Sequence, residues 1–356
     1  MKKVLHIVTR LDVGGISSLI YNYYLQMFKS ELQFEIVAVD TGYKHVHHNK
    51  FQKLGIPVYY MPDNLGGRIS FLYNLLRTKQ YYAVHSHVEL PSAIYLTIAK
   101  LVGVKVRIAH AHLAVENIGL KNRMLSTLLN LVVSQRVGAS NNAISSLFGK
   151  RYIPHAVIIK NAIRVSDYSF DSKTREKLRE EFNIEDDLVL GFVGRLTYLK
   201  NPFFLLKILE ETIKVNDRAM LIVVGDGELK REFLNKAIEK NLDNNMILLG
   251  NREDVNNILM AMDVLLLPSF KEGLGMVLIE AQAAALKCIA NTSGIPAEAK
   301  ISSYLHFEDI ENGPKSWANI IVEKCINYSR SSTVEEITNN KYNIVTEVRH
   351  FENLYR

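Results

Sequence analysis

The chain has 356 residues, of which 48% are hydrophobic and 22% are charged. At roughly 150 residues per domain, this length predicts two globular domains. No apolar run reaches the ~18 residues of a membrane-spanning helix, and the chain has only two cysteines, so we expect no membrane span, disulfide framework or cysteine metal site. The composition therefore favours a cytoplasmic protein.

Charge is unevenly distributed along the chain. Residues 1–165 contain 20 Lys and Arg against 7 Asp and Glu, a net charge of +13, whereas residues 166–356 contain 23 against 30, a net charge of −7. A basic first half suits nucleic acid, anionic lipid headgroups or a phosphorylated substrate. The alternative is that the bias only keeps the protein soluble.

Apolar strands alternate with helices through the first half, which predicts a doubly wound parallel sheet. Gly14 and Gly15 follow the first strand and could open the backbone and a helix N-terminus to a ligand, although any tight strand-to-helix turn uses glycine. We expect strands at 2–9, 34–39, 55–61, 82–85, 104–109 and 156–159, and helices at 16–28, 70–78 and 120–133.

Two histidine pairs mark expected strand ends, where open α/β sheets bind their ligands. His85 and His87 flank Ser86, and His110 and His112 flank Ala111. Strand alternation sends both members of a pair to one side, so one can contact ligand while its mate packs. A metal site needs more converging ligands, and the sequence shows no third, so we expect no metal. A structural role is the alternative for each histidine.

The helix at 120–133 combines basic residues with an apolar strip at helical spacing. Lys121 and Arg123 precede Met124, Leu125 and further leucines. Such a basic amphipathic helix either lies in a membrane interface or packs in a core.

The second half begins with an apolar strand at 188–193 followed by two cations. Gly194 and Arg195 end this strand, and Lys200 precedes a new helix. A forked guanidinium and an ammonium at a strand end suit a diphosphate. Two further strands, at 220–225 and 246–250, end in Gly225-Asp226 and in Asn251-Arg252.

Residues 271–282, with the sequence KEGLGMVLIEAQ, contain two acids beside two glycines and an expected helix start. Glu272 ends a loop after an apolar strand at 264–267, and Glu280 lies on the expected helix 276–285. Gly273 and Gly275, which flank Leu274, would let a ligand approach the backbone at a helix start. The alternative is that both acids are ordinary solvated charges.

Together these segments resemble retaining glycosyltransferase family 4, also described as glycosyl transferases group 1. The two glutamates separated by seven residues match its acidic signature, and the Gly194-Arg195…Lys200 segment is similar to its pyrophosphate-binding loop. The segment VRIAHAH at 106–112 resembles the capsule and exopolysaccharide branch, with Ala111 in place of the usual serine.

The resemblance implies an α/β GT-B fold, in which two Rossmann-like domains with one parallel sheet each face a cleft. Residues 1–163 would form the acceptor-binding domain and residues 164–340 the nucleotide-sugar-binding domain. Residues 341–356 would form a helix that crosses back to the first domain.

It also implies a hexosyltransferase that uses a nucleotide diphosphate sugar, most simply a UDP-sugar, with retention and without a metal or other cofactor. His112, His110 and Glu272 would act at the reacting centre, with no covalent protein nucleophile. Glu280 would hold the ribose, and the other expected donor-binding residues are Gly14, Gly15, Arg195, Lys200, Gly225, Asp226, Asn251, Arg252, Gly273, Leu274 and Gly275.

The branch that the sequence resembles implies an acceptor that is a lipid-diphosphate-linked saccharide or a glycan, at the inner face of the cell membrane. The basic first half agrees with an anionic membrane surface. A nucleotide-sugar epimerase of the same architecture is one alternative. A non-catalytic protein that binds membranes or nucleic acid is another, but it leaves Arg195, Lys200 and the two glutamates without a purpose.

Overall fold

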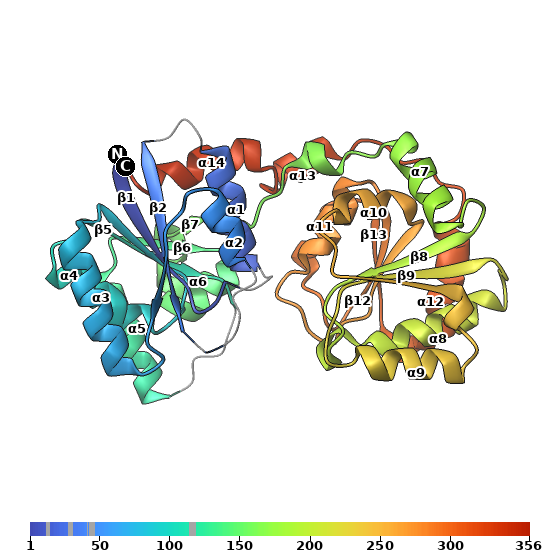
Figure 1. Ribbon diagram of the computed structural model, residues 1–356, viewed down its shortest axis with the longest axis horizontal. Helices are drawn as coiled ribbons and strands as arrows, with labels where there is room; N and C mark the ends of the chain where they lie inside the picture. Colours follow the sequence, from blue (N-terminus) through green and yellow to red (C-terminus); the bar gives the residue numbers. More distant parts are fainter. Residues whose placement is uncertain (12–14, 28–30, 41, 43–46, 114–118) are drawn as a thin grey trace. The chain divides into compact units, whose positions relative to one another are not determined.

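The computed structural model describes residues 1–11, 15–27, 31–40, 42, 47–113 and 119–356. These form two compact units (Figure 1). The first unit contains Met1–Ile163 together with Ile344–Arg356, and the second contains Arg164–Asn343. The C-terminal segment that belongs to the first unit therefore begins at Ile344, where the last helix starts. The predicted boundary, at residue 341, lies three residues earlier.

The first unit is built on a parallel sheet of seven strands, in the order β3-β2-β1-β4-β5-β6-β7. Successive strands are added on one side of β1 and then on the other, so the direction of winding reverses between β1 and β4. Ligands of such sheets bind at the carboxyl ends of the strands near this reversal. The strands are β1 Lys2–Ile7, β2 Leu32–Val39, β3 Val58–Met61, β4 Ala83–Ser86, β5 Val106–Ala111, β6 Gln135–Gly138 and β7 Val157–Ile158.

Helices cover both faces of this sheet. Leu5, Val84 and Ala109 belong to the apolar cluster on the face of α3 to α6, while Val4 and Ala83 belong to the cluster on the other face, which includes residues of α1 and α14. This alternation is the two-residue period of strands that are buried on both sides. The helices are α1 Gly15–Gln26, α2 His48–Lys53, α3 Leu65–Lys79, α4 Ser92–Leu101, α5 Leu120–Val132, α6 Asn141–Phe148 and α14 Ile344–Asn353.

The second unit repeats this plan with a six-stranded parallel sheet in the order β10-β9-β8-β11-β12-β13, so its winding reverses between β8 and β11. Its strands are β8 Leu188–Val193, β9 Ala219–Val224, β10 Met246–Gly250, β11 Val264–Leu267, β12 Lys287–Asn291 and β13 Leu305–Glu308. Its helices are α7 Ser172–Phe182, α8 Pro202–Ile213, α9 Lys230–Glu239, α10 Val255–Ala261, α11 Met276–Ala283, α12 Gly313–Lys324 and α13 Val334–Asn339.

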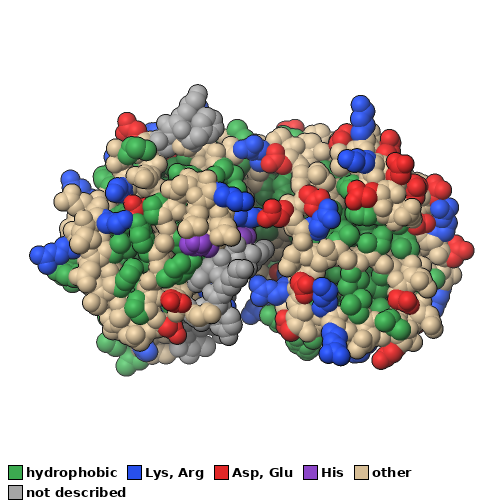
Figure 2. Space-filling view, in the orientation of Figure 1, with side chains coloured by type: hydrophobic (Ala, Val, Ile, Leu, Met, Phe, Trp, Pro, Cys, Tyr) green, Lys and Arg blue, Asp and Glu red, His purple; other side chains and the backbone are tan. Residues whose placement is uncertain are grey.

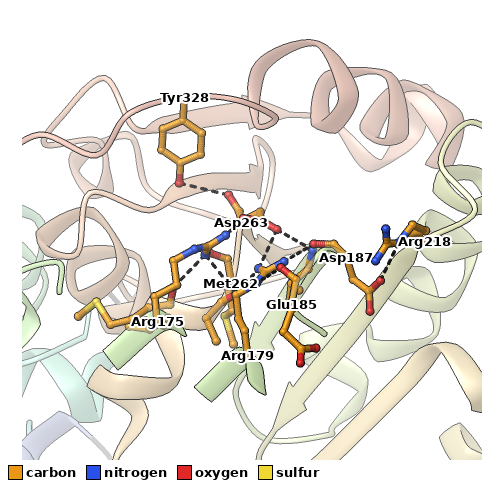
Figure 3. Close-up of polar contacts among 12 residues, drawn as sticks. Arg175, Arg179, Glu185, Asp187, Arg218, Met262, Asp263 and Tyr328 are labelled. Carbon is orange, nitrogen blue, oxygen red and sulfur yellow. Dashed lines mark hydrogen bonds and ion pairs between the residues drawn. The ribbon is translucent and has the colours of Figure 1, made fainter. Parts of the chain in front are cut away.

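A charged network fastens α7 to the sheet of the second unit. Asp263, just before β11, accepts hydrogen bonds from Arg175 at 2.6 Å, from Arg179 at 3.3 Å and from the backbone N–H of Val189 at 2.8 Å. Figure 3 shows both guanidinium groups converging on this carboxylate, with the hydroxyl of Tyr328 donating to the Asp263 carbonyl at 3.2 Å. The network therefore stabilises the end of the sheet opposite to the carboxyl ends of the strands.

Candidate active site

The cationic loop after β8 and the acidic loop after β11 lie side by side at the winding reversal of the second sheet. The backbone N–H of Phe270 donates to the carbonyl of Leu199 at 2.8 Å, and the side-chain amide of Asn201 donates to the carbonyl of Pro268 at 3.3 Å. These bonds tie together segments that lie about 70 positions apart in the sequence. The residues predicted from the two motifs are thus brought to one edge of the sheet.

Lys200 and Glu272 form an ion pair at this edge. The Oε1 atom of Glu272 that contacts Lys200 also accepts a hydrogen bond from the hydroxyl of Ser269 at 2.7 Å. The backbone N–H of Glu272 donates to the carbonyl of Gly294 at 2.9 Å. The Glu272 side chain is only 10% exposed, so its position is closely defined. The sequence assigned the two groups to different parts of a ligand, and the structure adds that they contact each other.

Arg195 differs from Lys200 in having no fixed partner. Its side chain is exposed, and its guanidinium makes no hydrogen bond or ion pair with any residue that the structure describes. A free guanidinium beside a paired ammonium leaves this edge able to bind an anion.

Glycines let the loops after β8 and β9 pack against each other. A Cβ atom at Gly225, which has φ of +130°, would lie 2.0 Å from the carbonyl oxygen of Gly194. The Gly194 N–H donates to the carbonyl of Val224 at 2.9 Å, and the Leu196 N–H donates to that of Asp226 at 3.0 Å. Gly225 therefore serves the packing of these loops, whatever else it contacts.

The other charged residues of these loops are engaged locally. Asp226 accepts from the Gly227 N–H and from Lys230, each at 2.8 Å, and its pKa is lowered chiefly by Lys230. Arg252 makes two hydrogen bonds to Asp254, at 2.8 and 2.7 Å. Asn251, its neighbour, is exposed. No ligand role for these residues follows from their contacts alone.

Glu280 is the second predicted acid, and it lies on α11 facing Tyr168 in the short 3-10 helix Val165–Tyr168. Burial of the carboxyl raises its pKa from 4.5 to about 7, an effect that the hydrogen bond from Tyr168 only partly offsets. Helix α11 stops at Ala283, two residues earlier than predicted, because Ala285 adopts a left-handed conformation with φ of +50°.

The glycines before α11 differ in what they require. Gly275 precedes the helix with φ of +77°, a conformation that favours glycine, whereas a Cβ atom at Gly273 would meet nothing within 4 Å. Leu274 between them is partly buried.

In the first unit, Gly15 begins α1 and its carbonyl accepts from Asn161 at 3.2 Å, while Gly14 lies outside the described residues.

The predicted histidines converge on one face of the first sheet. His87 lies 2.9 Å from His112 through their Nδ1 and Nε2 atoms, and His85 lies 3.3 Å from His110 through Nε2 and Nδ1. Burial lowers the pKa of His112 to about 3 and lowers those of the other three as well, so the rings are neutral at pH 7. Only His112 is partly exposed.

A fifth histidine, His6 on β1, was not recognised from the sequence. Its Nδ1 atom lies 3.0 Å from Nε2 of His87, and its ring packs 4.3 Å from that of Phe34. The sequence alone made no third converging ligand evident, whereas the fold brings further imidazoles together. Within the described residues, one triad of potential ligands combines His87 with His110 and His112, and a second combines it with His6 and His85.

Helix α5 exposes much of its apolar strip. Leu120, Met124 and Leu131 are 76%, 66% and 70% exposed, while Leu129 and Val132 are buried. The strip is thus divided between core packing and an apolar surface. None of the helices in the described residues is long and apolar enough to cross a membrane.

Comparison with known proteins defines the class. Residues 174–308 match the family described as glycosyl transferases group 1. A structure of Anabaena Alr3699/HepE in complex with UDP superposes with a TM-score of 0.73 at 16% identity, covering 99% of this chain and 95% of that one. The chain is a glycosyltransferase with the GT-B fold.

Similarity to named glycosyltransferases indicates the branch of the class that this chain resembles. EpsF of Bacillus subtilis (strain 168) is 28% identical over 82% of this chain and 79% of its own. The capsular polysaccharide biosynthesis glycosyltransferase CapH of Staphylococcus aureus is 25% identical over 100% and 99%. An Escherichia coli UDP-Gal:alpha-D-GlcNAc-diphosphoundecaprenol alpha-1,3-galactosyltransferase is 26% identical over 80% and 77%. The match over residues 174–308 and these relatives support the predicted resemblance to the glycosyl transferases group 1, in their capsule and exopolysaccharide branch.

Proposed function

We propose that the protein transfers a hexosyl group from a UDP-sugar, with retention of anomeric configuration, to a lipid-diphosphate-linked saccharide or a glycan acceptor. The observation that carries this proposal is the contact of Lys200 with Glu272 beside the unpaired Arg195 at the winding reversal of the second sheet. Support for the donor and acceptor comes from the UDP bound to the Anabaena protein and from the UDP-Gal donor and diphosphoundecaprenol acceptor in the name of the E. coli relative.

The cations would neutralise the diphosphate as negative charge develops on it during bond cleavage. Lys200 is held by Glu272, so the ammonium is oriented before the ligand binds, and the second carboxylate oxygen of Glu272 can accept a sugar hydroxyl. Because this edge has an unpaired guanidinium, Arg195, and an oriented ammonium, Lys200, the proposed transfer needs no metal ion on the diphosphate, which corresponds to retaining glycosyltransferase family 4.

Glu280 is proposed to hold the ribose hydroxyls, and burial raises its pKa to about 7, which brings its titration into the neutral range. The backbone around Gly225, Asp226, Asn251 and Arg252 is proposed to flank the nucleotide. In the first unit, the partly exposed His112, supported by His110, is proposed to orient the acceptor.

The proposed place of action is the inner face of the cell membrane. The chain up to residue 165 carries a net charge of +13, and α5 presents exposed Leu120, Met124 and Leu131 next to Lys121 and Arg123. Exposed apolar side chains beside cations bind anionic bilayers by insertion and attraction together. Co-sedimentation with anionic and with neutral vesicles tests this, and Met124→Ser should weaken binding to the anionic vesicles.

The donor site is tested by calorimetric binding of UDP, GDP and ADP in the presence of EDTA. We expect selective binding of UDP, weakened at least tenfold in Lys200→Ala and unchanged in Lys207→Ala, which removes an exposed lysine of the neighbouring α8. Equal binding of UDP by the two variants would remove the central premise.

Turnover is tested with UDP-sugars and lipid-linked acceptors. Loss of one preorganised charge should lower kcat by about 10²–10³ in Lys200→Ala. The anomeric configuration of the product, determined by NMR, distinguishes retention from inversion. Products formed from UDP-sugar without any acceptor would indicate the epimerase instead.

A further inference from the structure

The histidine cluster of the first unit has the organisation of a metal centre with an outer layer of supporting groups. Its five imidazoles come from the ends of β1, β4 and β5 and share one face, because the register pairs His6 with His85 and Ser86 with Ala109, which places His87 beside His110. One ring nitrogen from each of His87, His110 and His112 lies within 4.8 Å of the other two.

The remaining two histidines each hydrogen-bond with one nitrogen of an inner ring. His87 uses Nε2 toward His6, at 3.0 Å, and His110 uses Nδ1 toward His85, at 3.3 Å. The nitrogens that remain are Nδ1 of His87, Nε2 of His110 and, across the 2.9 Å contact with His87, Nε2 of His112. Metal-binding histidines are held in this way, with the second ring nitrogen bonded to an outer partner that fixes the ring orientation.

The outer partners are themselves fixed. Nδ1 of His85 lies 2.6 Å from the hydroxyl of Tyr355. Tyr355 follows α14 and belongs to the same unit. The partly buried carboxylate of Glu89 accepts from the backbone N–H of His112 at 2.8 Å and from that of Leu113 at 3.2 Å. Tyr355 therefore supports the His110 ring through His85, while Glu89 fixes the backbone at His112.

Hydrogen bonding alone does not account for the whole cluster. It joins His6, His87 and His112 in a row, but the buried Nε2 atoms of His6 and His110 have no hydrogen-bond partner of ordinary geometry among the described residues. The backbone of Ile159 contacts the His110 ring and partly offsets the lowering of its pKa by burial, but at a geometry outside that of an ordinary hydrogen bond. Buried polar atoms without a partner are rare in folded proteins and call for an explanation.

We propose that His87, His110 and His112 bind one divalent transition-metal ion of the zinc class. Three imidazoles without a carboxylate or thiolate suit Zn²⁺, Co²⁺ or Ni²⁺ and do not suit Mg²⁺ or Ca²⁺, which require oxygen ligands. Three protein ligands leave the fourth position of a tetrahedral ion for water or a hydroxyl group.

Binding such an ion requires the three ligand nitrogens, which lie within 4.8 Å of one another, to reach nearly equal spacing. Zinc–imidazole bonds of about 2.0–2.1 Å place tetrahedral ligand nitrogens about 3.3 Å apart. The observed 2.9 Å between His87 and His112 would widen by a few tenths of an ångström as the ion takes the place of the proton that the two rings share. His112 is the ligand that is partly exposed. Histidine side chains are visible at the surface of the first unit in Figure 2.

This site is separate from the proposed donor site, since all its ligands belong to the first unit and Arg195, Lys200 and Glu272 belong to the second. The two proposals can therefore fail independently. Metal binding is read from the purified protein without any sugar substrate, and UDP binding is read in the presence of EDTA.

The test uses full-length protein without a histidine tag. Metal-free protein is titrated with Zn²⁺ and, separately, with Co²⁺, and its melting temperature is followed by circular dichroism. We expect one equivalent of zinc per chain by mass spectrometry, an increase in melting temperature of about 5 °C at saturating zinc, and visible absorption of the intensity that four-coordinate cobalt shows.

His112→Ala is the diagnostic variant, because His112 is the partly exposed ligand and its loss leaves the buried rings in place. His155→Ala, which removes an exposed imidazole of the same unit, is the matched control. Zinc binding should be lost in the first variant and retained in the second. Absence of stoichiometric zinc in the wild type, a six-coordinate cobalt spectrum, or equal binding by the two variants would each overturn the proposal.

Discussion

The raised pKa of Glu280 predicts a dependence of stability on pH that can be isolated in one substitution. The folded protein holds this proton more tightly than the unfolded chain does, because the carboxyl pKa is about 7 when folded and 4.5 otherwise. The corresponding stability is fully present below about pH 4.5 and is lost as the pH rises through about 7. Glu280→Gln cannot ionise and keeps an acceptor for Tyr168, so it removes this loss.

Between pH 5 and pH 8 the ionisation of Glu280 should cost the wild type roughly 2 kcal/mol, after allowance for partial solvent exposure of the residue. The advantage of Glu280→Gln in free energy of unfolding should grow by that amount over the same interval. Urea unfolding followed by fluorescence measures it, because the single tryptophan, Trp317, is fully buried in the second unit. Glu335→Gln, at an exposed position, is the control. A pH-independent difference between Glu280→Gln and the wild type would refute the reasoning.

Two further predictions concern the second unit and use the same fluorescence signal. Asp263→Ala should destabilise it by about 3–5 kcal/mol, because two guanidinium groups, of which that of Arg179 is buried, lose their partner. Asp186→Ala, at an exposed ion pair, should cost under about 1 kcal/mol. Similar losses in the two variants would contradict the role of the network in Figure 3. Gly225→Ala should destabilise the unit and weaken UDP binding, because its Cβ would lie 2.0 Å from the carbonyl oxygen of Gly194, whereas Gly273→Ala should leave the fold unchanged. Calorimetric titration with UDP checks the second part, and wild-type affinity in Gly225→Ala would show that the loop tolerates the change.

Much of the architecture follows from the sequence, because strands buried on both faces produce continuous apolar runs. The run at 264–267 coincides with β11, and the run at 246–250 coincides with β10. Helix ends were less predictable, since they depend on backbone conformations that no side-chain pattern encodes, such as the left-handed Ala285 after α11. Helix α4 was missed because it is apolar on most sides, with six of its ten residues buried, and so lacks the polar face that marks a surface helix.

At the candidate site, too, the individual motifs could be predicted from the sequence, whereas the contact between them could not. The motifs around Lys200 and Glu272 were recognisable one at a time, but their ion pair joins positions 72 apart and depends on the order of strands in the sheet. The contact changes the interpretation of both residues, because an ammonium already neutralised by a carboxylate attracts a diphosphate less strongly than a free one. Arg195 must then provide most of the net positive charge at this edge of the sheet, and Lys200 provides direction.

The convergence of the histidines in the first unit depends on the order and register of three strands. The sequence determines this arrangement, but it cannot be read from the sequence directly. His6, His85 and His110 are separated by 79 and 25 positions, yet β1, β4 and β5 are neighbours in the sheet. Once that order is known, the alternation of side chains sends all five imidazoles to the face that α1 and α14 cover. A lone histidine in an apolar strand, such as His6, is therefore informative only together with the residues that the adjacent strands place beside it.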